Sequence, residues 1–423
     1  MIRNLSIGLV ASYFFLYLIG NLSLTYDRYT VQFLVLSIIN LSAFLIILKS
    51  KNFIIGLDSI KSNKHLIFYL GFIVFSLLSI VVANNKAESI IIFSQYLSFF
   101  FALILIFTLS RQMKFNIINL TLLFCIISLI IESSYILYIF FDNIILNGQQ
   151  FERSNIYKGF TANINIAAFS LVAKSPVVFY YLFITSNKKY KLLLGLLLFM
   201  ILLCLFILLS RGASIAFGFV LLFMSIYSLL KLAKNYFSYG IIIFSILTSY
   251  LLFSNLIVNV SVDGKQEQNL INKRVSDIQL NQDDDSINER IRFYLAAFES
   301  IKQNPFLGVG VGNWKIESMK YDAKYAKGYK VPFHAHNDFL QVAAESGIFA
   351  LTFFILFLFY PFILFFRNKL FITYDIKHFT FLVMLSVYVL DSMINFPIAR
   401  PISHIFLLFV LVSLINLNEI NEK

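Results

Sequence analysis

Two histidines stand two residues apart in the sequence HAHNDF, directly before a long apolar run. An imidazole at a membrane surface titrates near neutrality and accepts a proton from a hydroxyl, such as that of a sugar. His336 is the first candidate for such a base; Asn337 and an amphipathic turn follow it, and His334 is the competing candidate. A histidine at such a junction also serves simply to anchor a helix end at the interface. The residues alone leave the two uses open.

Three arginines supply positive charge beside small or hydroxyl-bearing residues. Arg211 lies in LLSRGAS between two apolar runs, where its planar guanidinium matches two oxygens of a phosphate or diphosphate. Arg290 and Arg292 begin a polar stretch, with Tyr294 one helical turn after Arg290. Positive potential there attracts an anionic headgroup. The alternatives are a snorkelling arginine on lipid phosphate and ordinary solvated loop charges.

Charged and polar side chains also fall inside apolar runs, where they must face protein, a cavity or one another. Glu132 and Lys174 are expected to pair if their spans are neighbours. Asp391, Arg400 and His404 gather around the short PIARP turn. A chain of such groups suits a proton or ion relay, so a transporter stays an alternative, although the spans lack the interrupted, matching halves that transporters show.

Several other site types are disfavoured. The turn GVGVGNW follows a proline and a helix and has no Lys-Ser/Thr after it, which argues against a nucleotide loop. Cys125 and Cys204 lie in apolar runs and form no metal-ligand spacing. The acidic run at 283–285 attracts a divalent cation loosely at most and is typical of a solvated loop. We therefore expect no cofactor and no metal.

Membrane helices must position these residues. The chain has 423 residues, of which 59% are hydrophobic and 13% charged, far from the balance of a soluble domain. The sequence predicts an all-α, polytopic integral membrane protein with about twelve transmembrane helices and one large loop that contains helices. The first run is read as a retained helix and not as a signal peptide. The predicted spans are 5–22, 31–48, 66–83, 90–109, 116–141, 161–184, 191–209, 212–230, 237–254, 339–366, 378–396 and 402–418.

The basic residues give the orientation. With both termini in the cytoplasm, the whole excess of +12 lies on the cytoplasmic side and the remaining segments are balanced. The net charge therefore reports topology, and a nucleic-acid partner is excluded. Residues 255–338 then form a periplasmic loop between transmembrane helices 1–9 (1–254) and 10–12 (339–423), all within one integrated membrane domain. Inside this loop, Ile291, Leu295, Phe298 and Ile301 have helical spacing and predict a helix from about 288 to 303, ended by Asn304-Pro305.

Three stretches resemble one family. HNDFLQVAAESGIFA resembles the periplasmic-loop motif of the O-antigen ligase and polymerase superfamily, in which His-Asn/Ser/Gln is followed after nine residues by Gly-x-x-Gly. Ala350 stands where the final glycine is expected, which puts the close-packing role of that glycine in doubt. NERIRFYLAAFESIKQNPFLGVGVGNW and LLSRGAS are similar to two further family segments, and GFTANINIAAF with Pro176 looks like its sixth-span region. The resemblance covers roughly residues 155–420.

The resemblance implies a division of labour. His336 would be the general base or orient the acceptor hydroxyl, with Asn337 orienting the histidine. Arg211 and Arg290 would hold the diphosphate of an undecaprenyl-diphosphate-linked glycan. Arg292, Tyr294 and His334 are predicted to bind substrate around them. The donor is already activated, so positioning, one proton transfer and stabilisation of the leaving phosphate suffice, and the reaction would invert the anomeric centre.

Superfamily members join O-antigen to lipid A-core, extend its repeat units, or move glycans onto protein Ser or Thr. The late, single large loop favours the ligase, acting with membrane lipids around it at the periplasmic face of the bacterial inner membrane. A polymerase is the second interpretation and a protein O-oligosaccharyltransferase the third. A transporter of lipid-linked glycan is the alternative outside the enzymes.

Overall fold

The computed structural model describes residues 2–19, 28–49, 63–112, 115–149, 151, 153–231, 235–260, 285–323, 332–367 and 375–421. Throughout these ranges the regular structure is helical, with no β-strand. Eleven of the described helices are long and apolar enough to cross a membrane. The prediction of an all-α polytopic membrane protein is therefore confirmed.

The first predicted span differs from the others. It forms α1 (Ile2–Phe14), which has 13 residues, followed by a short 3-10 turn at Leu16–Leu18. At the helical rise, thirteen residues cover only about 20 Å, short of the ~30 Å hydrocarbon core. The remainder of the predicted run, from residue 20, lies outside the described residues.

The chain forms two compact units, which we describe separately. Unit 1 comprises residues 1–117, 282–373 and 388–423, and unit 2 comprises residues 118–281 and 374–387. The boundary passes through α17 (Ile376–Ile394). The division at 254 and 338 that the sequence suggests stays a prediction.

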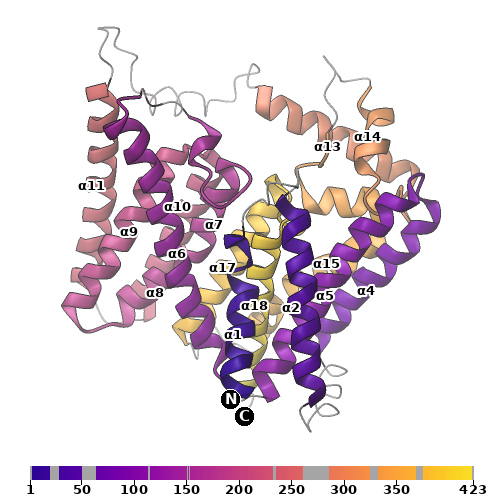
Figure 1. The fold of residues 1–423 in the computed structure, drawn as a ribbon, viewed down its shortest axis with the longest axis horizontal. Helices are drawn as coiled ribbons and strands as arrows, with labels where there is room; N and C mark the ends of the chain where they lie inside the picture. The colour runs from indigo at the N-terminus through magenta and orange to yellow at the C-terminus, as the bar shows by residue number, and fades with distance from the viewer. Residues whose placement is uncertain are drawn as a thin grey trace. The chain divides into compact units, whose positions relative to one another are not determined.

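Unit 1 carries most of the residues with candidate chemistry. In Figure 1, α1 begins and α18 ends at one end of this unit, and α13 and α14 lie at its other end. Arg111 near the end of α5 pairs with Glu419 in α18, two residues that the charge pattern assigns to the same side of the membrane. The side itself stays a prediction. Besides α1 and the end of α17, the α-helices described in this unit are α2 (Arg28–Lys49), α4 (Lys64–Ser79), α5 (Lys86–Gln112), α13 (Asp285–Gln303), α14 (Trp314–Asp322), α15 (Asp338–Arg367) and α18 (Pro401–Asn421).

The tenth predicted span, α15, is broken at Gly347, whose φ of 83° and ψ of 176° are not helical. Beyond the break it packs along α4, with Phe75 stacked on Phe349 at 5.2 Å between ring centroids. A Cβ atom on Gly71 of α4 would overlap the ring of Phe353. The tight approach of the two helices thus depends on Gly71, while Ala350, in place of the family's second glycine, is accommodated fully buried.

The predicted loop helix is α13, and it ends at Gln303 as Asn304-Pro305 indicates. Its buried side includes Phe293, Ala296 and Ala297, of which the two alanines pack in a small core with Trp314. The stripe that revealed the helix is largely exposed, with Ile291 at 50% and Phe298 at 51% of full exposure. The spacing therefore located the helix but not the face that packs against the protein.

Unit 2 is a bundle of apolar helices. The predicted sixth span is split into α7 and α8 at Ser175-Pro176, and the closely spaced seventh and eighth runs are two separate helices. Leu209, between the latter two, adopts a left-handed conformation with φ of 45°. The helices are α6 (Ile117–Phe141), α7 (Ile164–Lys174), α8 (Pro176–Ile184), α9 (Lys188–Leu208), α10 (Arg211–Lys231) and α11 (Tyr236–Val260).

The predicted pair of Glu132 and Lys174 is present in unit 2. Lys174 Nζ lies 2.5 Å from Glu132 Oε1, and both side chains are buried. Ser128 Oγ donates to Glu132 Oε1 at 2.7 Å and Ser170 Oγ donates to Oε2 at 2.8 Å. A buried charge is tolerated when it is paired and hydrogen-bonded, so this cluster joins α6 to α7 without leaving an isolated charge.

Candidate functional site

His336 lies in a short segment before α15, residues 332–337, which we call the histidine loop. Its φ of 54° is in the left-handed region, which costs free energy for any residue but glycine. Tyr294 of α13 holds this conformation, because its hydroxyl donates to His336 O at 3.0 Å and to Met393 O at 3.2 Å. One phenol thus fastens the histidine loop to the end of α17.

The start of α15 fixes the other side of the loop. Asn337 Oδ1 accepts from Leu340 N at 3.0 Å, as a helix cap does, and Asn337 Nδ2 donates to Met393 O at 3.0 Å. Asp338, fully buried, accepts from Ile398 N at 3.0 Å. The Asn337 side chain therefore positions the backbone around His336, and the orienting of the imidazole that the resemblance implies stays a prediction.

The two histidines differ in how they meet the ring of Phe396, which follows α17. The His334 ring stacks on it at 3.9 Å between centroids and an interplanar angle of 13°. The His336 ring meets it edge-on, at 5.2 Å and 80°, and lies nearly parallel to Phe293 at 6.1 Å. His334 is thus laid flat against an aromatic ring, and His336 stands at the ring's edge.

A buried arginine lies behind this ring. The Cζ atom of Arg400 is 3.9 Å from the centroid of Phe396, and the residue retains only 1% of its full exposure. Its Nη1 atom is 3.9 Å from Asp391 Oδ2, and Asn395 Nδ2 donates to the other carboxylate oxygen at 2.7 Å. The predicted gathering around the PIARP turn is present for Asp391 and Arg400.

His404 follows Arg400 by one turn of α18, and its N–H donates to Arg400 O at 2.9 Å, but its side chain faces other helices. Its ring nitrogens contact the hydroxyls of Tyr69 at 2.8 Å and Tyr388 at 3.1 Å, so it bonds α4 and α17 to α18. Every one of these three side chains is buried. His404 therefore serves packing between membrane helices and not the PIARP group.

The two arginines of α13 have different surroundings. Arg292 Nε is paired with Asp322 Oδ1 at 2.9 Å, which ties α13 to the end of α14. Arg290 is half-buried and faces Tyr294: burial raises the pKa of Tyr294, and the charge of Arg290 and a hydrogen bond with Asn337 oppose that rise. The phenol therefore stays protonated and able to donate at neutral pH.

Arg211 is the first residue of α10, in unit 2. It directly follows Ser210, which comes after the left-handed Leu209. Ser214 Oγ donates to Ser210 O at 3.0 Å. Its contact with a diphosphate stays a prediction.

The glycine-rich turn is a structural element of unit 1, which we call the glycine bracket (residues 305–314). Gly308, Gly310 and Gly312 all have positive φ, and a Cβ atom at any of them would overlap neighbouring atoms of α15 or α5 or of the segment between α4 and α5. Its backbone bonds to the break in α15: Val309 N donates to Ala344 O at 2.9 Å, and Ile348 N donates to Pro305 O at 2.8 Å. The bracket holds the kinked helix in place.

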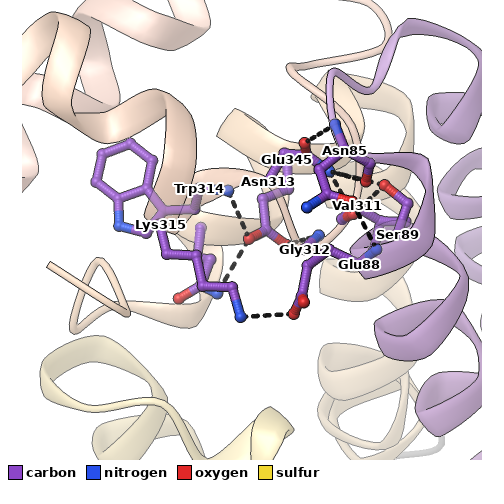
Figure 2. Close-up of polar contacts among 10 residues, drawn as sticks. Asn85, Glu88, Ser89, Val311, Gly312, Asn313, Trp314, Lys315 and Glu345 are labelled. Carbon is purple, nitrogen blue, oxygen red and sulfur yellow. Dashed lines mark hydrogen bonds and ion pairs between the residues drawn. The ribbon is translucent and has the colours of Figure 1, made fainter. Parts of the chain in front are cut away.

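Glu345 connects the bracket, whose contacts with it are drawn in Figure 2, to Gln341 and through it to the histidine loop. Its buried carboxylate accepts from Gly312 N at 3.0 Å and from Trp314 N, at the start of α14, at 3.3 Å. Negative charge at a helix N-terminus is favourable. Gln341 donates to the same carboxylate at 3.3 Å and accepts from Ala335 N, between the two histidines, at 3.2 Å.

The bracket and the residue after it also bond to the start of α5. Asn313 Nδ2 donates to Ser89 Oγ at 2.7 Å, its Oδ1 accepts from Asn85 N at 2.8 Å, and Lys315 pairs with Glu88 at 2.6 Å, as Figure 2 shows. The N–H and C=O groups of the bracket, described above, thus bond to protein partners. This close packing is a sufficient reason for the glycines, and a bound phosphate is not needed to explain them.

Sequence reasoning did not single out Phe396, Gln341 or Glu345 as parts of this site. Phe396 adjoins the PIARP turn, and Gln341 and Glu345 lie four residues apart within the motif that carries the family resemblance. These positions were the available signal. Among the residues that the structure describes, no group of three His, Cys, Asp or Glu side chains is arranged to hold a metal ion. The acidic run at 283–285 lies outside the described side chains.

Part of the chain matches a known family. Residues 194–355, fewer than half of the chain, match the family model described as O-antigen ligase. This match supports the resemblance to the O-antigen ligase and polymerase superfamily. The matched stretch contains Arg211, α13, the glycine bracket and the histidine loop, so this domain includes every candidate catalytic residue. No curated protein matches the chain. The superfamily acts on lipid-linked glycans, and the chain is a multi-pass membrane protein.

Proposed function

We propose that this protein is an O-antigen ligase, which transfers a glycan from undecaprenyl diphosphate to a hydroxyl of a lipid A-core acceptor. The reaction would take place at the periplasmic face of the bacterial inner membrane. The observation that carries the proposal is the backbone conformation of His336 within the matched domain. The fold holds this residue in a costly backbone conformation, with its carbonyl oxygen bonded to the Tyr294 hydroxyl of α13.

The chemistry needs one base and a stabilised leaving group. His336 accepts the proton of the acceptor hydroxyl while the hydroxyl oxygen forms a bond to the anomeric carbon. The bond from that carbon to the diphosphate oxygen breaks, and the electron pair leaves with the undecaprenyl diphosphate. Displacement in one step inverts the anomeric centre. Because the diphosphate is already a good leaving group, the step is complete with a base and cationic groups.

Arg290 is the cation of unit 1 that we assign to the diphosphate. Arg292 is less suited, since its guanidinium already pairs with Asp322. A guanidinium binds two phosphate oxygens at once and so orients the leaving group as well as stabilising its charge. Arg211 is proposed for the same task on the strength of its position in the matched domain.

The decisive experiment uses full-length protein in proteoliposomes with an undecaprenyl-diphosphate-linked glycan and a lipid A-core acceptor. We expect His336→Ala to lower the turnover number by about 100-fold or more, the usual contribution of a general base. Arg290→Ala and Arg211→Ala should also lose most turnover. Arg367→Ala, an exposed arginine at the end of α15, is the matched control and should retain full activity.

The variants must keep the wild-type elution profile and melting temperature, so that lost turnover reports chemistry. Activity within a few-fold of wild type in His336→Ala would contradict the base assignment, and absence of any glycan transfer by the wild type would favour the transporter interpretation. Mass spectrometry of the products then tests the acceptor. Glycan found on lipid A-core supports a ligase, and a longer glycan still attached to the lipid carrier identifies a polymerase instead.

A further inference from the structure

The two histidines of the loop face the same aromatic ring, but only one of them is placed for proton transfer. We propose that His334, Phe396 and Arg400 form a positioning stack behind His336, in which His334 acts as a flat, uncharged ring and not as a second base. The functional part of this inference rests on the proposed transferase reaction. The structural part does not, and it is tested separately below.

The geometry of the stack comes from two distances to one ring. The His334 ring centroid and the Arg400 Cζ atom are each 3.9 Å from the centroid of Phe396. Because two groups cannot occupy the same face of a ring at that distance, they lie on opposite faces. Phe396 is thus enclosed between an imidazole and a guanidinium, and its remaining edge is presented to His336.

Arg400 is an unusual residue to find at the back of this stack. Its side chain is almost wholly buried, and its Nε and Nη1 atoms have no hydrogen-bond partner in the described part of the chain. Asp391, at 3.9 Å, is the facing carboxylate, and the buried Asp338 lies close enough to act electrostatically on the same group. A desolvated guanidinium over an aromatic face gains from the ring's negative quadrupole. The ring therefore stabilises the cation.

The charge of Arg400 acts in turn on His334 through the ring. Burial, followed by the nearby Arg400, His336 and Lys315, lowers the pKa of His334 well below its usual range, and a hydrogen bond with Gln341 opposes this only in part. A histidine in these surroundings stays neutral at physiological pH. It cannot then repel a proton arriving on His336, and its flat face fills the space beside Phe396.

Two substitutions at one position separate a flat ring from a base. His334→Phe keeps an aromatic ring and removes both nitrogens, and we expect its turnover number to stay within about threefold of wild type, less than one hydrogen bond's worth. His334→Ala removes the ring and should lower the turnover number by about tenfold with little change in KM, the cost of a misplaced base. Loss of more than about 100-fold in His334→Phe would overturn the proposal, since a base would then have been removed.

The ring of Phe396 is tested in the same way. Phe396→Leu should lower the turnover number while KM for the lipid-linked donor is maintained, and Phe396→Tyr, which keeps the aromatic face, should restore most of the loss. Equal activity of Phe396→Leu and wild type would remove the ring from the mechanism. Because a leucine at this position is able to unfold the loop, a readout that needs no activity accompanies these variants.

That readout is the ring signal of His334 in carbon-13 histidine-labelled protein in nanodiscs. The signal is assigned as the one absent from His334→Phe, and we expect it to stay constant between about pH 5 and pH 8 in wild type, well above its lowered pKa. In Arg400→Gln one positive neighbour is lost, so the pKa of His334 rises and the signal begins to titrate at a higher pH. Arg367→Gln, at the far end of α15, should leave the signal unchanged.

The outcomes distinguish the two proposals. A His334 signal that titrates near the ordinary histidine value of about 6.5 in wild type overturns the stack whatever the enzyme does. A His334 signal that does not change with pH, together with no glycan transfer by wild type, supports the stack and contradicts the proposed function. A signal that does not change with pH, together with active His334→Phe and inactive His336→Ala, supports both proposals.

Discussion

The histidine loop and the glycine bracket lie in the same unit, and the sequence marks both with residues that are typical of ligand sites. They differ in what their polar groups face. The bracket uses its glycines and Asn313 to bond protein on every side, from α5 to the break in α15. The histidine loop carries a strained residue, His336, held by contacts to its backbone from Tyr294. Satisfied groups build a support, whereas backbone strain of the kind seen at His336 is typical of functional sites.

This contrast predicts that the bracket determines stability and the histidine loop determines turnover. Glu345 and Gln341 join the two, since one carboxylate receives the bracket's N–H groups and the glutamine that fastens Ala335. Substitutions on either side of that connection should therefore separate the two properties.

The largest effect is expected at Gly347. A Cβ atom there would overlap the carbonyl oxygen of Phe306, and the φ of +83° disfavours any side chain. Gly347→Ala should therefore cost more than about 4 kcal/mol and prevent accumulation of folded protein. Gly148→Ala is the matched control, with φ of +60° and nothing within 4 Å, and should cost only about 1 kcal/mol. Equal expression and melting temperatures for the two variants would show that the bracket is not a tight support.

The next effect is expected at Glu345. Its carboxylate accepts three N–H groups, and Glu345→Gln replaces one accepting oxygen by a donor that faces them. We expect a loss of stability of about 2 kcal/mol, seen as a lower melting temperature and faster hydrogen exchange at Gly312 and Trp314. Glu299→Gln on α13, outside this set of bonds, should leave both unchanged. Unaltered exchange at those two amides in Glu345→Gln would contradict the described bonding.

These two predictions also show what the sequence could and could not supply. The membrane helices and α13 follow from apolar runs and helical spacing, which are local properties of the chain. The bracket does not, because Asn313 bonds Ser89 from 224 residues away. GVGVGNW was disfavoured as a nucleotide loop, but its bonding partners could not be named. The exposed stripe of α13 shows the same limit, because helical spacing identifies a helix but does not tell which of its faces packs against the protein.

The candidate site was predictable in part. His336, Asn337 and Tyr294 were named from their types and their motif, and the structure places them together with Arg290. Phe396 was missed, since a phenylalanine among 49 carries no individual signal. The distinction between His334 and His336 was likewise undecidable from spacing, which does not show how either ring meets Phe396.

On the histidine loop itself, Tyr294→Phe tests whether turnover separates from stability. The variant removes one hydroxyl that donates to the carbonyls of His336 and Met393, while the ring stays. With about 1 kcal/mol for such a bond, we expect the turnover number to fall by about fivefold. Tyr321→Phe is the control: its hydroxyl accepts from Asn304 beside the bracket, and its loss should leave turnover unchanged. A variant Tyr294→Phe with normal turnover would show that the strain at His336 is held by other contacts.

The smallest effect is expected at the pair of Arg292 and Asp322, which joins α13 to α14 between the two regions. Burial raises the pKa of Asp322, and Arg292 opposes this rise. Above the ordinary value of 3.8 the folded protein therefore binds more protons at this carboxyl than the unfolded chain does. Its contribution to stability is fully present below that pH and is lost as the pH rises through the folded pKa.

Asp322→Asn resembles the protonated carboxyl, so the variant should be no less stable than wild type at neutral pH. Acidification to about pH 4 should bring the two melting temperatures together, within the few degrees that such a group controls. Parallel melting curves across that range would mean that the ion pair, and not burial, governs Asp322.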